Sequence, residues 1–430
     1  MQRISVTIEA QSPLAIGRRK PGGSISEAES YIPGSVLRGA IAAQILRAAQ
    51  QAEPQLVGNP DLAANGGDFQ TLFLADEAAI FQNAYPCLYK ADEDYQVSAT
   101  PIYVLPASAV SSKTNPGFKP KGYGVFDTLI DRFCAAACDH PYDPNCPEDN
   151  GRVEPFSGFY SCANNQANDI TRLASQFRSH TAEKRLLTGV GINRRRSTSQ
   201  DSVLYSLQVL SETHGKGNSS HAATYKTSIL VQQADLAKQL TQLLNAWGPT
   251  LRLGGAASRG LGKIQLTATC QEDPTDLAQR VQTFNQALRD RWQQWSNLFS
   301  TPELASDRQF FTLDLQSEAI LTEQWQRTTV ISPASLQATV QLADASLRLE
   351  AAYSSYNYRS GWHSAWGLMK DVELVTQLGS VYLFSTTYLE QWRPKLERLE
   401  QTGIGDRTCE GFGQVRVCDP FHTIFREEAQ

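Results

Sequence analysis

The sequence predicts an α+β protein with two domains, and three observations support this prediction. The chain has 430 residues, of which 41% are hydrophobic and 19% charged, so it can form two globular cores. Apolar residues alternate in some segments and recur at helical spacing in others. A glycine-rich loop before a strand occurs at 254–263 and again at 403–413, which indicates an internal repeat.

The N-terminal segment predicts a strand and then a helix. Ile4, Val6 and Ile8 alternate with polar residues, which is the pattern of a half-buried strand. A polar, basic loop leads to Ser35, whose side chain suits a helix N-cap. Residues 36–52 then have the composition of a helix with one buried side.

Residues of about 50–170 differ from their surroundings. Gly, Pro, Asn and Asp are frequent there, and the strand-like runs are short. One helix is expected near 125–138. We interpret this region as an insertion on a smaller core.

The region after the insertion completes a first domain. Its predicted strand, strand, helix and strand lie at 202–210, 224–232, 234–247 and 264–268. Together with the N-terminal strand and helix, they have the order of a split βαβ unit. An amphipathic helix is expected over 277–299, and its aromatic stripe suits packing rather than base stacking.

The last part of the chain ends as the first domain does. Strands are predicted at 310–321, 346–353 and 380–384, followed by a helix at 395–401. The second glycine-rich loop and a final strand follow. We therefore expect domains at 1–300 and 308–430.

The two glycine-rich loops are candidate binding sites. Glycine lets the backbone approach a ligand closely, and consecutive N–H groups can hold phosphate oxygens. A dinucleotide-binding loop would follow a strand and open a helix, the reverse of the order here, and no GxxxxGK[ST] motif occurs. A plain helix-to-strand turn is the alternative, but the duplication favours function. The expected contacts in the first loop are Gly254, Gly255, Ser258, Arg259, Gly260, Gly262 and Lys263.

Further short motifs accompany these loops. They are Ile32–Gly39, Ser360–Trp362, Gly367-Leu368 and Gly379–Tyr382. Together with the N-terminal strand and both loops, they resemble the RAMP superfamily of CRISPR-associated RNA-binding proteins. The resemblance does not cover 50–170. It implies two tandem ferredoxin-like (RRM-like, βαββαβ) domains with a large insertion in the first.

Within that superfamily, two domains with an inserted cysteine region resemble the subunit of type III-D complexes that binds the 5′ handle of CRISPR RNA. The resemblance implies a non-catalytic RNA-binding subunit in antiviral defence. Its implied partners are the CRISPR RNA, the large polymerase-domain subunit and the RAMP backbone subunits, with target RNA contacted indirectly. We expect Ser35 and Arg38 to lie with the first loop beneath the handle backbone. Trp362 and His363 are candidates to recognise its splayed bases.

The segment 172–196 is a basic patch in an acidic chain. The net charge is -5, so a nucleic-acid role must rest on local patches. Seven Lys and Arg against Glu183 give this segment a charge of +6. Such a patch can bind phosphates, and a solvated basic hairpin is the alternative. The expected RNA contacts are Arg185, Arg194, Arg195 and Arg196.

Four cysteines fall close together in the insertion. Cys134, Cys138, Cys146 and Cys162 have the number of ligands for a closed zinc site, although they lack CxxC pairs. Buried free thiols are the alternative. The N-terminus has no signal-peptide pattern and the chain has no long apolar run, so we expect a cytoplasmic protein without a membrane partner. One structural zinc is the only cofactor considered.

Three rival functions follow from the same residues. An endoribonuclease that processes precursor CRISPR RNA would use a histidine, and His180, His214 and His221 lie near basic or glycine-rich sequence. A backbone subunit that cleaves target RNA would use an aspartate such as Asp127 or Asp131, which a solvated helix face explains equally well. A protein-interaction scaffold is the third. We expect no catalysis.

Overall fold

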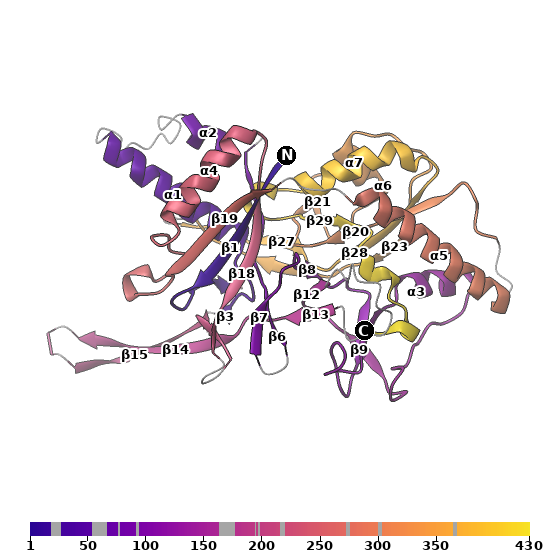
Figure 1. Ribbon diagram of the computed structural model, residues 1–430, viewed down its shortest axis with the longest axis horizontal. Helices are drawn as coiled ribbons and strands as arrows, with labels where there is room; N and C mark the ends of the chain where they lie inside the picture. The colour runs from indigo at the N-terminus through magenta and orange to yellow at the C-terminus, as the bar shows by residue number, and fades with distance from the viewer. Residues whose placement is uncertain are drawn as a thin grey trace.

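Figure 1 shows the computed structural model as two β-sheets side by side, with a long hairpin projecting from one end. The structure describes residues 1–18, 27–53, 67–75, 78–91, 94–162, 177–193, 195–196, 198–215, 220–271, 276–299, 303–363 and 368–430. Helices and antiparallel strands alternate along it, which confirms the α+β prediction. None of the helices in these ranges is both long and apolar enough to cross a membrane.

The first sheet has the strand order β19-β1-β18-β4, with β5 also paired to β18. Its elements are β1 (Gln2–Ala10), β4 (Ile80–Phe81), β5 (Tyr85–Pro86), β18 (Thr224–Val231), β19 (Ile264–Gln271), α1 (Gly34–Ala52), α2 (Gly67–Phe73) and α4 (Ala234–Trp247). Ile4, Val6 and Ile8 of β1 are buried in one core with Leu37 of α1 and Leu240 of α4. The order is that of a split βαβ unit.

Two local predictions in this unit are wrong. Segment 202–210 lies in β15 (Thr198–Leu210), which pairs with β14 (Lys184–Asn193) in the projecting hairpin, and the short β4 takes its place in the sheet. Ser35 is not the N-cap of α1, because that position is Pro33. Instead, the Gly34 N–H donates to Asn83 Oδ1 at 2.8 Å, so a distant side chain satisfies the helix start.

The second sheet repeats the first, with the order β23-β28-β20-β29. Its elements are β20 (Gln309–Leu315), β23 (Arg348–Tyr353), β28 (Val381–Thr386), β29 (Val415–Val417), α6 (Pro333–Val340) and α7 (Leu389–Thr402). The Phe311 ring lies 5.6 Å from the Trp392 ring of α7. The repeat first detected in the glycine-rich loops therefore extends to strand order.

The second sheet is also covered by α3 (Leu129–Ala137) and α5 (Leu277–Phe299). Phe133 of α3 packs 5.5 Å from Phe310, which neighbours Phe311 on β20. Leu277, Phe284 and Leu288 of α5 are buried in the same core. The division into domains at 1–300 and 308–430 stays a prediction. Helix α5 falls within the first of these ranges, yet it packs against the second sheet.

The inserted region is completed by the C-terminal residues. Its strands are β6 (Leu88–Ala91), β7 (Asp94–Val97), β8 (Tyr103–Val104), β9 (Ala109–Ser112), β10 (Val125–Asp127), β11 (Val153–Pro155), β12 (Phe159–Cys162) and β13 (Phe177–His180). Phe421 is buried among Phe118, Tyr160 and Phe177. The Val125 N–H donates to the Gln430 carbonyl at 2.9 Å. The part of the insertion from β8 to β12 therefore packs on the second unit, by which we mean the second sheet with its helices and the C-terminal residues. The earlier part, α2, β4 and β5, belongs to the first unit, which is the first sheet with its helices.

Short two-stranded ribbons complete the described chain. They are formed by β2 (Gly17–Arg18) with β3 (Glu27–Ala28), β16 (Thr213–His214) with β17 (His221–Ala222), β21 (Leu321–Glu323) with β22 (Gln326–Thr328), β24 (Tyr356–Arg359) with β27 (Glu373–Thr376), and β25 (Trp362–His363) with β26 (Leu368–Met369).

Candidate nucleic-acid interface

The first glycine-rich loop is a turn built on positive φ angles. A short 3-10 helix, η4 (Ala257–Arg259), stands between Ala256 at φ 58° and Gly260 at φ 84°. The Gly255 N–H donates to the Ala15 carbonyl at 2.9 Å. A Cβ at Gly254 would lie only 2.5 Å from that carbonyl oxygen, so glycine is needed for the close approach.

The second glycine-rich loop has the same backbone design. Its 3-10 helix, η5 (Thr408–Glu410), stands between Arg407 at φ 58° and Gly411 at φ 95°. The Asp406 N–H donates to the Ile320 carbonyl at 2.9 Å, as Gly255 does to Ala15. The two loops therefore occupy equivalent places at the start of the last strand of each sheet.

The two loops differ in what covers them. At Gly411, a Cβ would meet Asn83 Oδ1 at 2.7 Å and the Phe81 carbonyl oxygen at 2.9 Å, so the second loop is packed against the first unit. At Gly260, a Cβ would meet nothing within 4 Å. Ser258, Arg259 and Lys263 of the first loop are exposed. In the first loop, residues 257–260 and Lys263 are all exposed, whereas in the second loop residues 407–410 are half-buried, so the first loop presents more of its backbone and cations to solvent.

The first loop adjoins the base of the β14–β15 hairpin. Leu261 of the loop is buried with Ala15 and with Val209 of β15. The Leu14 and Leu210 backbones donate to each other at 3.0 Å. The loop and the hairpin therefore form one continuous surface.

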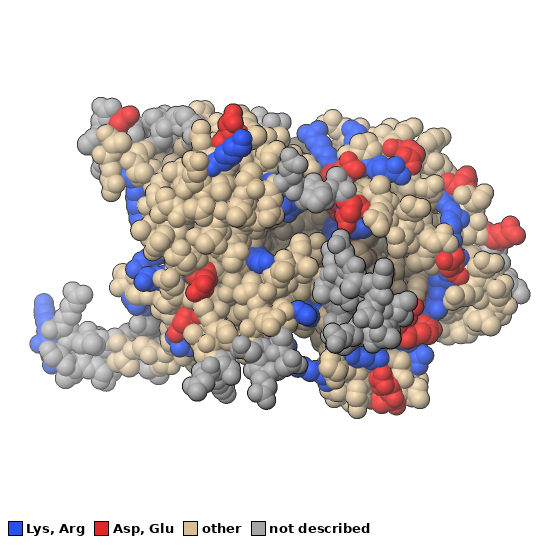
Figure 2. All heavy atoms as spheres, viewed as in Figure 1, with Lys and Arg blue, Asp and Glu red and all other residues tan. Residues whose placement is uncertain are grey.

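The basic residues of the hairpin divide into two groups. At its base, Arg185 forms an ion pair with Glu212 at 2.8 Å, and Lys184 donates to the Ala28 carbonyl at 2.7 Å. At its end, Arg195 and Arg196 are exposed, and Figure 2 shows basic side chains at the tip of the projection. Arg194 lies outside the described residues. Cations are therefore exposed at both the base and the tip of the hairpin, and at the base they are held by Glu212 and the Ala28 carbonyl.

Sequence reasoning missed Arg252. This residue is exposed and pairs through its backbone with Lys263, so it adds a third cation at the first loop, opposite Lys263. Its neighbours Leu251 and Leu253 are buried. The alternation of a basic residue with two buried leucines was the available signal.

The start of α1 does not adjoin the first loop as expected, but the second. A Cβ at Gly34 would lie 3.0 Å from the Glu410 carbonyl oxygen. Arg38 donates to the Phe73 carbonyl at 2.6 Å and stacks 5.4 Å above the Phe73 ring, so it holds α2 in place. Ser35 is half-buried beside this contact. Trp362 and His363 lie in β25, but their side chains are outside what the structure describes.

Two of the three histidines of the rival enzyme hypothesis are buried, and the third, His221, is half-buried. His180 is buried, with Nδ1 donating to the Leu88 carbonyl at 2.9 Å and Nε2 2.8 Å from the Ser161 hydroxyl. Burial, aided by nearby cations, lowers the pKa of His180 to about 4, so the ring is neutral. His214 is also buried, and burial lowers its pKa. The hydrogen bonds of His180 give it a structural role.

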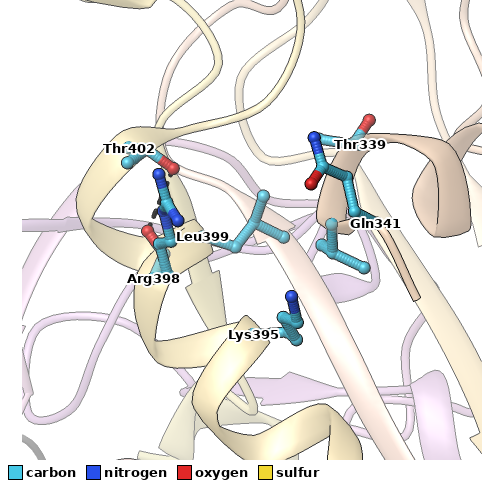
Figure 3. A pocket seen from close by; sticks show the side chains of 7 residues that line it. Thr339, Gln341, Lys395, Arg398, Leu399 and Thr402 are labelled. Carbon is cyan, nitrogen blue, oxygen red and sulfur yellow. Dashed lines mark hydrogen bonds between the residues drawn. The ribbon is translucent and has the colours of Figure 1, made fainter. Parts of the chain in front are cut away.

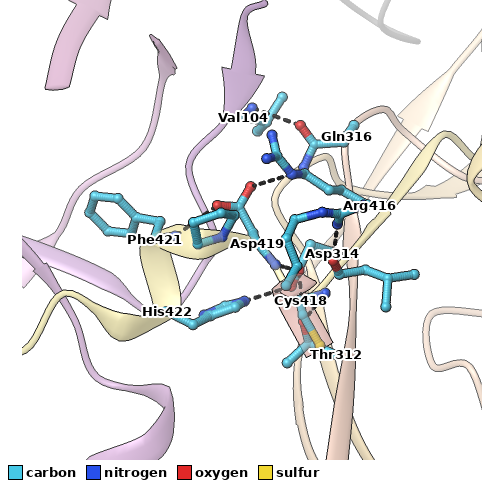
Figure 4. Close-up of polar contacts among 12 residues, drawn as sticks. Val104, Thr312, Asp314, Gln316, Arg416, Cys418, Asp419, Phe421 and His422 are labelled. Carbon is cyan, nitrogen blue, oxygen red and sulfur yellow. Dashed lines mark hydrogen bonds and ion pairs between the residues drawn. The ribbon is translucent and has the colours of Figure 1, made fainter. Parts of the chain in front are cut away.

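Asp127 is likewise structural, which corrects the expectation of a solvated helix face. It is 2% exposed and accepts from the Ser108 hydroxyl and the Leu129 N–H, each at 2.7 Å. The His422 imidazole lies 2.8 Å from Asp314 (Figure 4) and 3.3 Å from Asp127. Burial opposes the charge of this imidazole, but the two carboxylates outweigh it and hold the pKa of His422 well above its usual range.

Asp131 is held in the same manner. It is 1% exposed and accepts from Arg291 Nε at 2.6 Å, Trp295 Nε1 at 2.8 Å and the Tyr142 hydroxyl at 3.0 Å. These bonds join α3 to α5. Neither aspartate presents a carboxylate to a ligand.

The four cysteines do not converge on a metal site. Cys134 is buried in the core of the second unit, whereas Cys162 packs beside the aromatic cluster of the insertion. Burial raises the pKa of Cys134 to about 12, which favours the thiol over the thiolate that zinc requires. No group of three or more His, Cys, Asp or Glu side chains in the described residues, Cys138 and Cys146 included, is arranged to hold a metal ion. The zinc prediction therefore does not fit this geometry.

A surface hollow of about 250 Å³ lies between α6 and α7. Figure 3 shows Thr339 and Gln341 on one side and Lys395, Arg398 and Thr402 on the other. It contains none of the predicted site residues. We assign no role to it.

No protein-family model and no curated protein matches the chain. Among solved structures, it is similar to a chain of the type III-B Cmr-beta complex bound to cognate target RNA, with 11% identity, 96% of each chain covered and a TM-score of 0.40. A chain of a type IV-B CRISPR complex has 14% identity and a TM-score of 0.25, covering 64% of this chain and 93% of that one. A Cas6 product complex has 14% identity and a TM-score of 0.26, covering 48% and 79%. Likenesses this distant transfer no residue's role.

Proposed function

We propose that the chain is a non-catalytic RNA-binding subunit of a type III-D-like CRISPR effector complex. Two tandem ferredoxin-like RAMP domains, at 1–300 and 308–430, would anchor the 5′ handle of the CRISPR RNA. The subunit would bridge the large polymerase-domain subunit and the RAMP backbone subunits in the cytoplasm. The motifs of the resemblance support this proposal, and so do the two sheets with the same strand order.

One observation carries the RNA-binding part of this proposal. Two loops share a backbone design, yet one is covered by the neighbouring unit and the other is exposed. The exposed loop carries Arg259 and Lys263, with Arg252 beside it. It packs against the base of the β14–β15 hairpin, whose tip is basic. Cations around an open backbone turn suit the phosphates of a single strand. Trp362 and His363 keep their proposed role in reading handle bases.

The proposal that the subunit is non-catalytic is supported by the burial of residues that the rival enzymes would use. Asp127, Asp131 and His180 are buried, and each has structural hydrogen bonds. Incubating the protein with repeat-containing RNA tests this directly. We expect the RNA to stay intact, and cleavage that is lost in a His180→Ala variant with wild-type stability would support the processing enzyme instead.

The RNA site is tested by charge reversal in the first loop. Arg259→Glu and Lys263→Glu should each weaken binding of handle-bearing RNA. Each should also reduce the slope of log affinity against log salt by about 0.7 per lost phosphate contact. Fluorescence anisotropy at three salt concentrations measures both. Arg393→Glu, which alters a partly exposed arginine on α7, is the matched control, and equal affinities in all variants would refute the site.

A further inference from the structure

Trp325 is a nearly fully exposed tryptophan at the tip of the β21–β22 hairpin. Its relative exposure is 99%, whereas tryptophan is highly buried on average. It and Gln324 form the two-residue connection, with φ angles of 67° and 48°. Such turns favour Asn and Gly, because a larger side chain is strained at positive φ. Neither solubility nor turn geometry therefore explains a tryptophan at this position.

The hairpin that carries Trp325 is anchored to the rest of the second unit by packing, ion pairs and a hydrogen bond. Leu321 is buried in the core of the second unit. Arg327 forms ion pairs with Asp406 of the second loop at 2.5 Å and with Glu373 of β27 at 2.8 Å. The Ser332 hydroxyl donates to Glu323 at 2.5 Å. A side chain presented on a hairpin anchored in this way loses less conformational freedom on binding than one on a loose loop.

The charges around the hairpin indicate the kind of partner. Glu323, Glu373 and Asp406 against Arg327 give a local charge of −2. A negative surface repels RNA phosphates and attracts a cationic protein surface. Tryptophan is among the residues most enriched in binding hot spots, and arginine stacks well on its ring.

We propose that Trp325 anchors a different protein chain, which receives the indole in an apolar pocket rimmed by Lys or Arg. The hairpin belongs to the second unit, whereas the first glycine-rich loop and the β14–β15 hairpin, which carry the RNA-binding proposal, belong to the first. The inference thus goes beyond RNA binding and does not depend on it.

The partner can be identified by photo-crosslinking in the native complex. The full chain, tagged and with p-benzoylphenylalanine at position 325, is expressed in its own host, illuminated and purified. We expect an adduct with one other protein that resists ribonuclease, attached at a segment containing Lys or Arg. The same probe at Tyr388, which is 52% exposed, is the control and should not give that adduct. A ribonuclease-sensitive adduct, an adduct with a second copy of the chain or no adduct would overturn the proposal.

A second measurement uses natural side chains. Trp325→Ala should reduce recovery of the crosslinked protein with the tagged chain at least tenfold, and Trp325→Phe should restore part of it. Because the side chain is exposed, neither variant should lose stability. Affinity for handle RNA should stay at the wild-type value in both, which separates this proposal from that of the first loop. Undiminished recovery with Trp325→Ala would refute it.

Discussion

At the scale of single residues, burial decides which chemical groups are available. Asp127, Asp131 and His180 have the side chains that RNA cleavage could use, but all three are enclosed and hydrogen-bonded. No pattern in the sequence shows that Arg259 and Lys263 are exposed, yet the fold leaves both exposed. The side chains that could cleave RNA are thus enclosed, whereas the cations that could bind it are at the surface.

The neutral state of His180 predicts an acid-sensitive fold. Its pKa is about 4 in the folded chain and about 6.5 when unfolded, so the unfolded chain takes up the proton first as the pH falls. Its contribution to stability is complete above pH 6.5 and is lost towards pH 4, with about 2 kcal/mol gone at pH 5. Urea unfolding measures the fall in unfolding free energy from pH 7 to pH 5, and this fall should be about 2 kcal/mol smaller for His180→Asn than for the wild type. Identical pH dependence would contradict this assignment.

At the scale of elements, one loop design is used twice for different purposes. The second loop packs against β4 and the start of α1, and its Glu410 is held by Arg407 and by Lys370 at 3.0 Å. Burial opposes ionisation of Glu410, but these two cations keep its pKa below the usual value. The second loop therefore joins the units, which leaves the first loop for a ligand.

Matched glycine substitutions separate these purposes. Gly411→Ala and Gly260→Ala share the cost of a side chain at positive φ, about 1 kcal/mol. Only Gly411→Ala also brings a methyl group against Asn83 and Phe81, which should cost a further ~1–3 kcal/mol. Thermal or urea unfolding of the two variants measures the difference. Equal destabilisation would show that the second loop is not tightly packed between the units.

At the scale of the whole molecule, a buried ionic cluster joins the two units. Arg359 of the second unit pairs with Glu318 and, across the interface, lies 3.3 Å from Glu29. It also donates to the Tyr31 hydroxyl at 2.8 Å and lies 5.7 Å from the centre of the Phe412 ring. One guanidinium thus neutralises carboxylates from both units, which fixes how the sheets lie relative to each other.

Removing this guanidinium should destabilise the molecule strongly. Arg359→Met leaves two buried carboxylates unpaired, which should cost about 3–5 kcal/mol of unfolding free energy. Arg393→Met breaks a surface pair with Glu390 and should cost less than about 1 kcal/mol. Urea unfolding compares them, and adding Glu29→Gln and Glu318→Gln should recover part of the loss. A small effect of Arg359→Met would mean that the cluster does not join the units.

Local patterns predicted much of the fold but not its pairing. The alternation of Ile4, Val6 and Ile8 and the leucine spacing of α4 correctly predicted a strand and a helix. Strand β4 was not predicted, because a strand of two residues is too short to show a periodic pattern. Segment 202–210 was wrongly assigned to the sheet, because apolar and polar residues alternate in a projecting hairpin as they do in a sheet strand. The four cysteines were grouped because they are close in the sequence. In space they are apart, because α3 packs Cys134 into one core and Cys162 lies beside another.

By itself, the sequence determined the α+β class, the duplicated loop and the basic hairpin, because periodicity, glycine and charge are local properties. Only the tertiary structure decided which loop is exposed, since that depends on Gly411 meeting Phe81 and Asn83 from the other unit. The tertiary structure alone also packed strands β10 and β12 of the insertion against the C-terminal residues Phe421 and Gln430. Contacts between residues hundreds of positions apart depend on the packed core, and no local pattern encodes them.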